Sequence, residues 1–379
     1  MDRAIVDSDG HINERDEILV DYLPEPFKGR RELLGRPFFP PTDHFHRMAE
    51  GILDSRERED DDHDTRNDYG GPRASLGHWQ SLLDESGIKW SALYPSRGLA
   101  INNWHSPEWG AALAQGYNDW LYQTFTSKEP RLKGVALMHL YDVDTAVTEM
   151  RRAILELGFE AAVLMSSGLP QPLGNEMYFP LYEEAVRLDV PVAVHAGSSD
   201  ALAIPDGISA LWEVRAMSHG AGQITSFLSM INGGVFDTFP KLRVAFLESG
   251  CGWIPYLVDR MDRVYHGRGK RLSRRMKVSP SEQLASGRIF VHAELDEWML
   301  PAVADVAGRD DIFMYASDFP HERWDAMVRE LDHFCEREDL TESLINNTLG
   351  LAAKRFYGID DEGNRIGGPR PGVKTPARP

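Results

Sequence analysis

The sequence predicts a single (β/α)8 TIM barrel, an α/β fold, with a long insertion after its first strand. Three observations carry this prediction. Apolar runs of strand length recur eight times along the 379 residues, helix-like stretches lie between most of them, and several runs end in side chains of metal-binding type. Strands that alternate with helices in this way fit a barrel of parallel strands. A doubly wound open sheet is the alternative that the same alternation allows.

The eight runs are mostly continuous apolar segments, as expected of strands buried on both faces. They are Ala4–Asp9, Lys89–Tyr94, Gly134–His139, Ala161–Met165, Pro191–His195, Arg243–Glu248, Ile289–Leu295 and Ile312–Ser317. Helices are expected between them at Glu108–Phe125, Val143–Leu157, Tyr182–Leu188, Val258–Tyr265, Glu297–Val306 and Trp324–Phe334. The first of these helices follows Ser106-Pro107, which is a strong N-terminal signal.

Two segments lie outside the alternation within a predicted barrel of residues 1–360. Residues 22–75 contain Pro-rich stretches and an acidic run at Glu57–Asp64. A long loop after a barrel strand lies on the catalytic face, so we expect a covering loop, with solvated filler as the alternative. Residues 361–379 are rich in Gly, Pro and Arg, which is typical of a flexible tail or of an arm on a neighbouring subunit.

Composition excludes several classes of protein. The formal net charge is −18, which disfavours nucleic acids and anionic membranes as partners. No apolar run reaches about 18 residues, so no membrane span is expected, and the N-terminus does not read as a signal peptide. Cys251 and Cys335 form no CxxC pair, which suits a reducing cytoplasm. We therefore expect a cytoplasmic protein.

Polar side chains alternate along the first predicted strand. Asp7, Asp9 and His11 share one face, because successive strand residues point to opposite sides. In a barrel that face points inward, where three polar groups would be costly without a partner. A divalent metal would supply that partner to Asp9 and His11, and a hydrogen-bonded polar cluster is the alternative. Asp7 lies deeper, so we expect it to support the site.

Two further strands end in side chains of the same type. His195 closes the fifth strand and would face the pocket of a barrel. A lone histidine is more often a core residue, but here it repeats the strand-end pattern, so we expect a metal ligand. Asp318 closes the eighth strand, where it could bind a metal and exchange a proton with metal-bound water. The alternative is that Asp318 caps the next helix near Glu322.

A glutamate closes the sixth predicted strand. Glu248 is costly to bury without a role, so it could be a general base, a ligand or a substrate anchor, with an internal salt bridge as the alternative. The turn after it contains Gly250 and Gly252 and matches no phosphate-loop spacing.

Five side chains are weaker candidates. Arg97 could bind a carboxylate or nitro group through its planar fork, and Glu14 could orient a ligand or substrate. His219 is a candidate catalytic residue in the long helical region after the fifth strand. Ordinary hydrogen bonding is the alternative for these three. Trp253 and His321 border the predicted pocket and would contact substrate.

Taken in order, three motifs resemble a known family. Asp9-Gly-His11, His195 in VAVHAG and Asp318 in YASDFPH are similar to the amidohydrolase-related branch of the amidohydrolase superfamily, which includes aminocarboxymuconate-semialdehyde decarboxylase and the resorcylate decarboxylases. The resemblance covers about residues 4–350. It implies a homo-oligomeric barrel with one divalent metal, usually zinc or manganese, held by Asp9, His11, His195 and Asp318. This nitrogen–oxygen set also suits iron.

One position departs from those decarboxylases. They usually carry a histidine at the end of strand six, where this chain has Glu248 in LESGCGW. The chain resembles here a subgroup often called metal-dependent hydrolases, which has Glu-Ser-Gly at this point. No lysine ends the predicted fourth strand, so the carbamoylated lysine of the superfamily is not expected.

The sequence therefore favours a metal-dependent hydrolase of a small cyclic or aromatic substrate. A metal-activated water would attack an electrophilic carbon, with Asp318 as general base and Glu248 as a second acid/base or a substrate contact. A metal-dependent non-oxidative decarboxylase of an aromatic or unsaturated acid is the alternative. A catalytically inactive barrel that binds a small ligand is a third reading, against which the complete ligand set argues.

Overall fold

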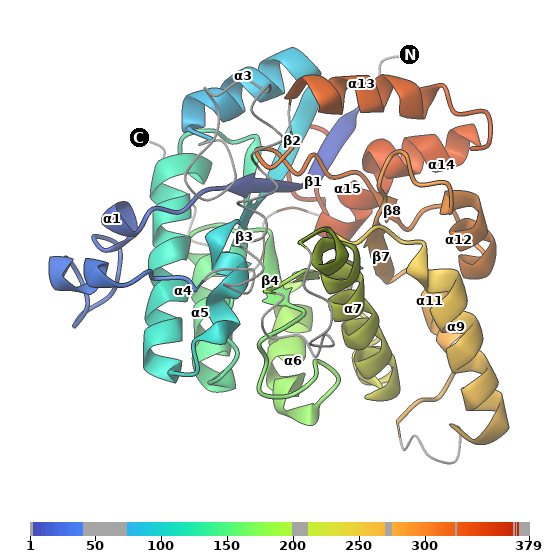
Figure 1. Cartoon of the computed structure of the whole chain (residues 1–379), viewed down its shortest axis with the longest axis horizontal. Helices are drawn as coiled ribbons and strands as arrows, with labels where there is room; N and C mark the ends of the chain where they lie inside the picture. The colour runs from blue at the N-terminus through green and yellow to red at the C-terminus, as the bar shows by residue number, and fades with distance from the viewer. Residues whose placement is uncertain are drawn as a thin grey trace.

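The computed structural model describes residues 3–40, 74–198, 211–269, 275–322, 324–366, 368 and 370. Eight parallel strands lie at the centre of the molecule, with helices around them (Figure 1). They follow the chain order β1 (Ile5–Ile12), β2 (Ile88–Pro95), β3 (Leu132–Leu137), β4 (Ala161–Met165), β5 (Val192–His195), β6 (Val244–Phe246), β7 (Ile289–His292) and β8 (Phe313–Met314).

Backbone hydrogen bonds join the last strand to the first. Ser8 donates its N–H to the carbonyl of Tyr315 at 2.9 Å, and further on Asp318 donates to the carbonyl of Asp9 at 3.1 Å. These bonds close the sheet between β8 and β1, so the predicted (β/α)8 barrel is confirmed. Every residue of β4, β5 and β7 is buried, as expected of strands covered on both faces.

The helices cover the outside of the barrel (Figure 1). Ser106 caps the helix after β2 as expected, since its side chain accepts the N–H of Trp109 and Pro107 occupies the first turn. The helices are α1 (Asp16–Leu19), α3 (Leu76–Ser86), α4 (Pro107–Leu121), α5 (Val143–Leu155), α6 (Phe179–Leu188), α7 (Leu211–Asn232), α8 (Val235–Thr238), α9 (Trp253–Val264), α11 (Pro280–Leu284), α12 (Leu300–Ala307), α13 (Trp324–Cys335), α14 (Glu342–Asn346) and α15 (Ala352–Tyr357).

Three predicted helices begin three or more residues from their predicted starts, and one of them, predicted from Tyr182, begins at Phe179. The helix predicted from Val258 begins at Trp253, because the turn after β6 passes directly into α9. The helix predicted from Glu297 begins at Leu300, because Glu297 makes contacts with that turn instead. None of the helices in the described residues is long and apolar enough to cross a membrane.

The two unusual segments are described only in part. Residues 41–73, where the covering loop is expected, lie outside the described residues. Phe38 and Phe39 precede them and are buried, and the carbonyl of Phe38 accepts the indole N–H of Trp104 at 2.6 Å. Most of the tail beyond residue 366 also lies outside, but Arg370 is buried and donates to the carbonyl of Phe159 at 3.0 Å. The homo-oligomer and the cytoplasmic location stay predictions.

Candidate metal centre

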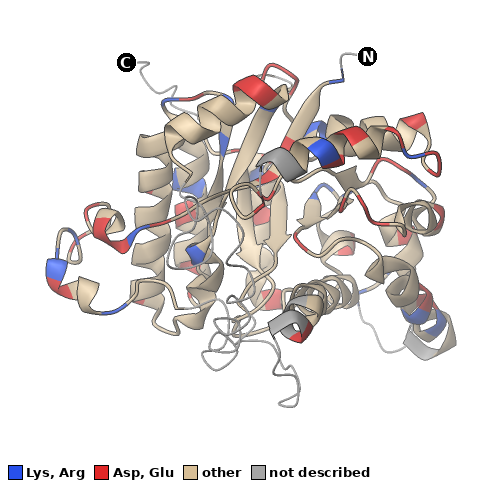
Figure 2. Cartoon of the chain, turned by 45° about the horizontal axis from the view of Figure 1, so that its top comes forward, with Lys and Arg blue, Asp and Glu red and all other residues tan. Residues whose placement is uncertain are grey.

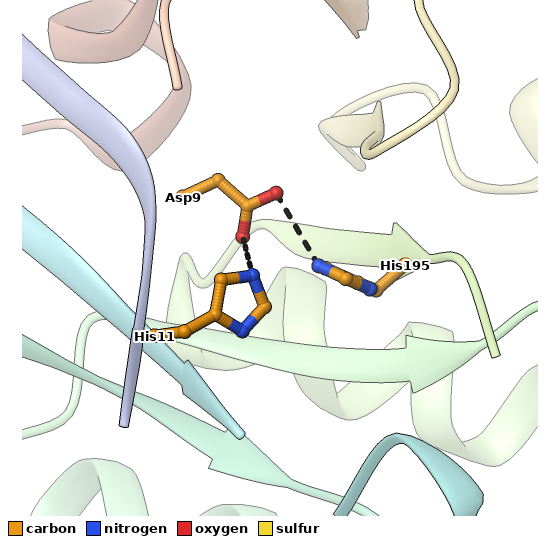
Figure 3. A group of neighbouring side chains, drawn as sticks. All are labelled: Asp9, His11 and His195. Carbon is orange, nitrogen blue, oxygen red and sulfur yellow. Dashed lines mark ion pairs between the residues drawn. The ribbon is translucent and has the colours of Figure 1, made fainter. Parts of the chain in front are cut away.

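Three predicted ligands meet inside the barrel at the C-terminal ends of the strands. Asp9 lies between the two imidazoles of His11 and His195 (Figure 3). Its Oδ1 is 3.6 Å from Nε2 of His11, and its Oδ2 is 3.3 Å from Nε2 of His195. Asp9 and His11 come from β1 and His195 comes from β5, so barrel closure brings together residues far apart in sequence.

The remaining nitrogen of each histidine fixes the state of its ring. Nδ1 of His11 lies 2.9 Å from the carbonyl of Pro95, and Nδ1 of His195 lies 2.9 Å from the carbonyl of Ala196. A carbonyl only accepts, so each Nδ1 carries a proton and donates it. In the neutral ring, Nε2 then presents a lone pair toward Asp9, as a metal ligand requires.

Asp318 completes the group from the β8 side. Its Oδ1 lies 3.3 Å from Nε2 of His11. The backbone of Asp318 has φ of 49°, in the left-handed region that residues other than glycine rarely adopt. Together with the bond from its N–H to Asp9, this conformation directs the carboxylate into the site. A strained backbone held at a pocket is typical of functional positions.

These residues fit a divalent cation. Four buried acceptor atoms have no hydrogen-bond partner among the described residues, namely Asp9 Oδ1, His11 Nε2, His195 Nε2 and Asp318 Oδ1. Buried polar atoms are normally paired, and four convergent acceptors cannot pair with one another. A metal would satisfy all of them, and two imidazoles with two carboxylates suit zinc, manganese or iron. The arrangement is a candidate site for one divalent metal.

The surrounding charges move the pKa values of these groups apart. Burial lowers the pKa of His11. Burial acts in the same direction on His195, but Asp9 and Glu248 outweigh it and raise the pKa to about 9, so a metal bound to Nε2 would take the place of a proton there. Desolvation, followed by the charges of Glu248 and Asp9, raises the pKa of Asp318 well above its usual range. Burial also opposes a charge on Asp9, but His195 outweighs it and the pKa of Asp9 is lowered.

Glu248 lies on the Nδ1 side of the His195 ring, whereas Asp9 lies on its Nε2 side. Its backbone has φ of 60°, and its Oε2 is 3.2 Å from Nδ1 of His195. That oxygen is a further buried acceptor without a hydrogen-bond partner among the described residues. Burial would raise the pKa of Glu248, but His219, His195 and His11 lower it below its usual value. Glu248 is therefore a charged carboxylate held beside the predicted metal ligands.

A cavity of about 470 Å³ opens beside these groups. Acidic residues lie on the central strands and on the loops around them (Figure 2). Neither lysine nor arginine is among the described residues that line the cavity. His219 of α7 is one of the lining residues, so the structure brings this predicted residue to the pocket. The acidic lining residues are Asp9, Glu248, Glu294, Asp296, Asp318, Glu322 and Glu330.

One histidine among the lining residues was absent from the sequence prediction. His292 ends β7 and is buried, and its Nδ1 accepts the backbone N–H of Glu248 at 3.2 Å. The predicted strand ran on to Leu295, which placed His292 inside the strand and away from the pocket. The strand-end pattern that identified His195 would have identified it, if β7 had been ended at His292.

Two of the weaker candidates, Glu14 and Arg97, bind neighbouring segments of the chain outside this cavity. The carboxylate of Glu14 accepts the N–H groups of Ser96, Arg97 and Gly98 at 3.3, 2.9 and 3.1 Å, and burial raises its pKa to about 7. The guanidinium of Arg97 pairs with Asp16 at 2.8 Å. Neither residue lines the described cavity, and substrate binding by either stays a prediction.

The other two weaker candidates have different surroundings. The indole N–H of Trp253 lies 3.1 Å from the carbonyl of Gly250, and its ring packs against Phe246 with ring centroids 6.3 Å apart. His321 packs edge-on against His11 with ring centroids 4.7 Å apart, and its Nε2 lies 2.9 Å from Oγ of Ser96. His321 is thus beside the predicted metal ligands, whereas Trp253 supports the turn after β6.

Asp7 lies beside the candidate metal centre, and its carboxylate accepts hydrogen bonds from the chain. Its carboxylate accepts from Oγ of Ser91 at 2.5 Å, from N–H and Oγ of Ser317 at 2.8 Å each, and from N–H of Asp9 at 3.2 Å. Its oxygens therefore bind donors from β1, from β2 and from the segment after β8. This arrangement agrees with the supporting role expected of Asp7.

Gly10 allows the close packing between the two predicted ligands of β1. A Cβ at this position would lie 2.4 Å from Cη2 of Trp79 and 2.5 Å from Oγ of Ser91. Real Cβ contacts do not reach such distances, so any side chain here would force Trp79 and Ser91 to move. The Asp9-Gly-His11 motif therefore combines two ligand side chains with a residue that gives β1 room to pack.

The turn after β6 is occupied by a carboxylate of the chain itself. Glu297 accepts the N–H of Cys251 at 3.0 Å and the N–H of Gly252 at 2.5 Å, and the Cys251 thiol lies 3.2 Å from its Oε2. This turn offers the backbone donors that bind anions in other proteins. Here they bind Glu297, which ties the β6 turn to the loop after β7.

Removing that carboxylate is expected to destabilise the turn. Glu297→Ala leaves two backbone donors without partners, which should lower the free energy of unfolding by about 1–3 kcal/mol. Burial and then Glu297 raise the pKa of the Cys251 thiol. In Glu297→Ala this pKa should fall, so the thiol should react faster with a disulfide reagent than it does in the wild type. Urea denaturation and thiol titration test both effects, with Glu297→Gln as the control that keeps an acceptor. An unchanged reaction rate of Cys251 would contradict the assignment.

The family model described as "Amidohydrolase" matches residues 93–359. The chain is 25% identical to 2-amino-3-carboxymuconate-6-semialdehyde decarboxylase of Dictyostelium discoideum over 258 residues, 68% of this chain and 69% of that protein. It is 28% identical to the γ-resorcylate decarboxylase of a Polaromonas species over 192 residues, 48% and 57% of the two chains. It is 26% identical to 2-keto-4-carboxy-3-hexenedioate hydratase of a Sphingobium species over 154 residues, 39% and 40% of the two chains. The last two matches therefore cover less than two thirds of those relatives.

Solved structures share the fold over almost the whole chain. An amidohydrolase of Mycobacterium avium subsp. paratuberculosis superposes with a TM-score of 0.70 at 20% identity, over 95% of this chain and 99% of that one. A 5-carboxyvanillate decarboxylase of Novosphingobium aromaticivorans, complexed with manganese and 4-hydroxy-3-methoxy-5-nitrobenzoic acid, superposes with a TM-score of 0.68 at 19% identity, over 94% and 96%. Identities this low establish similarity of fold alone.

Proposed function

Because this chain belongs to the amidohydrolase family, we propose that it is a metal-dependent, non-oxidative decarboxylase of a small aromatic or unsaturated acid. The main support for this proposal is the group of four buried acceptor atoms at the strand ends that have no hydrogen-bond partner among the described residues. A divalent metal would bind all four. Most of the relatives found by sequence similarity are decarboxylases. They support decarboxylation better than the hydrolysis that the sequence favours.

In this proposal Asp9, His11, His195 and Asp318 hold the metal. The bound metal would supply a Lewis acid that neutralises the substrate carboxylate. Manganese is present in a related structure, and zinc suits the same donors. The bond between carbon dioxide and the ring carbon breaks, its electron pair passes to that carbon, and Asp318 exchanges a proton with it as general acid. Glu248 remains charged, with its Oε2 3.2 Å from Nδ1 of His195.

The cavity also limits the substrate class. Its described lining is acidic and contains neither lysine nor arginine, so a substrate carboxylate is repelled everywhere except beside the metal. We therefore infer a preference for acids with one carboxylate, whose other substituents are neutral or hydroxyl groups.

Addition of water is the second candidate. Glu248 stands where decarboxylases of this branch usually have a histidine, and a carboxylate beside the site can act as a base toward water. A hydratase is among the relatives, so hydration of an unsaturated acid fits the same residues. Hydrolysis of a cyclic amide would use water in a different reaction, in which the carbon–nitrogen bond breaks as the new carbon–oxygen bond forms.

One assay separates these reactions. Protein loaded with Mn²⁺ or Zn²⁺ is incubated with hydroxybenzoates labelled with ¹³C in the carboxyl group, and in parallel with unsaturated acids and cyclic amides in H₂¹⁸O. Decarboxylation releases labelled carbon dioxide without ¹⁸O in the organic product, and Asp318→Asn should slow it by about 10²- to 10⁴-fold. Incorporation of ¹⁸O without carbon dioxide release would replace this proposal with the second candidate.

A further inference from the structure

The three strand-end histidines differ in what their Nδ1 atoms contact. In His11 and His195 each Nδ1 faces a carbonyl, which accepts a proton. In His292 the Nδ1 faces the backbone N–H of Glu248 at 3.2 Å, and an amide N–H can only donate. The ring of His292 therefore has the opposite arrangement of donor and acceptor from the two predicted ligands.

This contact determines where the proton of His292 lies. Since Nδ1 uses its lone pair to accept from Glu248, the proton of the neutral ring is on Nε2. The carboxylate of Glu294 is 3.9 Å from the same Nδ1, too far for a hydrogen bond that would reverse this assignment. No hydrogen bond from Nε2 to another described residue is present. An Nε2 with a proton cannot coordinate a metal, so His292 is a donor beside the metal centre.

The position of His292 gives that donor a function. The residue lines the cavity together with Asp9, Glu248 and Asp318, at the end of β7. Seven of the other described lining residues are acidic and offer acceptors. We propose that His292 is a substrate-binding residue that donates its Nε2–H to a phenolate or carboxylate oxygen of the substrate. The identity of that oxygen rests on the proposed function, whereas the position of the proton does not.

The proton position is measured directly, without turnover. Protein with ¹⁵N-labelled histidine and bound Zn²⁺ is observed by long-range ¹H–¹⁵N correlation, and the signals of His292 are assigned by their loss in His292→Gln. The neutral ring of His292 should show the Nε2–H form, and the two metal-bound rings should show the Nδ1–H form. An Nδ1–H form for His292, or a shift of its nitrogen on zinc addition as large as that of His195, would overturn the inference.

Substrate binding is measured on matched variants. His292→Ala should raise KM, or the dissociation constant of 2-nitroresorcinol as an unreactive aromatic anion, by about 10- to 100-fold, because a hydrogen bond to a charged group is lost. His292→Gln retains an N–H donor and should recover part of the affinity.

Metal content should stay at the wild-type level in both variants, and the exposed His333→Gln is the control. Loss of metal in His292→Ala, or unchanged affinity with a folded protein, would reject the role. If the wild type releases no carbon dioxide from any acid, the proposed function fails, and the NMR measurement still decides the state of His292.

Discussion

Replacing His11 or His195 with alanine is expected to abolish metal binding and activity together. Each ring supplies an Nε2 lone pair whose direction is fixed by a backbone carbonyl. Loss of a residue that merely orients a ligand weakens metal binding by about 10- to 100-fold. Loss of the ligand itself should therefore weaken it by more than about 100-fold, with turnover falling in parallel.

Stability provides a readout that does not depend on activity. A metal at about 1,000 times its dissociation constant stabilises the folded state by about 4 kcal/mol. The wild type should therefore unfold at a higher temperature with Zn²⁺ or Mn²⁺ than after chelation, and the two alanine variants should not respond. His333→Ala, on the exposed side of α13, should behave as the wild type. A variant lacking His195 that still shows the full metal-dependent shift would remove this residue from the ligand set.

Replacing Asp7 with alanine is expected to cause a large loss of stability. The carboxylate is fully buried and accepts four hydrogen bonds from Asp9, Ser91 and Ser317. Burial raises its pKa although all four bonds oppose that shift. The substitution leaves these donors unsatisfied at the β8–β1 junction, so the free energy of unfolding should fall by about 3–5 kcal/mol. That is a large part of the stability of a typical domain.

Chemical denaturation in the presence of EDTA isolates this effect from metal binding. Asp305→Ala, on the exposed surface of α12, removes a carboxylate without buried donors and should change stability by less than about 0.5 kcal/mol. Ser91→Ala removes one of the four donors and should have an intermediate effect. A loss for Asp7→Ala no greater than that of the exposed control would mean that water replaces the carboxylate.

The strands were predictable because their apolar runs are long and continuous. Ala161–Met165 was predicted to the residue, since all of β4 is buried and both ends are polar turns. The C-terminal ends were harder. Glu248 and Asp318 were predicted to close their strands, but β6 ends at Phe246 and β8 at Met314, and both carboxylates stand beyond the strands with positive φ. Strain at a pocket is a tertiary effect that local sequence does not reveal.

The proposed metal ligands were predictable for a different reason. Asp9, His11, His195 and Asp318 all stand where a barrel places its strand ends, so position alone indicated their convergence. Contacts among loops carry no such periodic signal. The three amide hydrogen bonds to Glu14 and the pairing of Arg97 with Asp16 depend on the exact path of the turn after β2.

The bonds between β8 and β1 have a consequence for the making of this protein. Asp7 and Ser317 are 310 positions apart, yet they are direct partners. A chain grows at about 5–20 residues per second, so Asp9 and His11 leave the ribosome on the order of 15 to 60 seconds before Asp318 is made. A nascent or truncated chain thus lacks one of the proposed ligands until translation of the last strand is complete. Full metal affinity would then distinguish finished molecules from fragments, and a metal-loaded population would contain only chains that have closed their barrel.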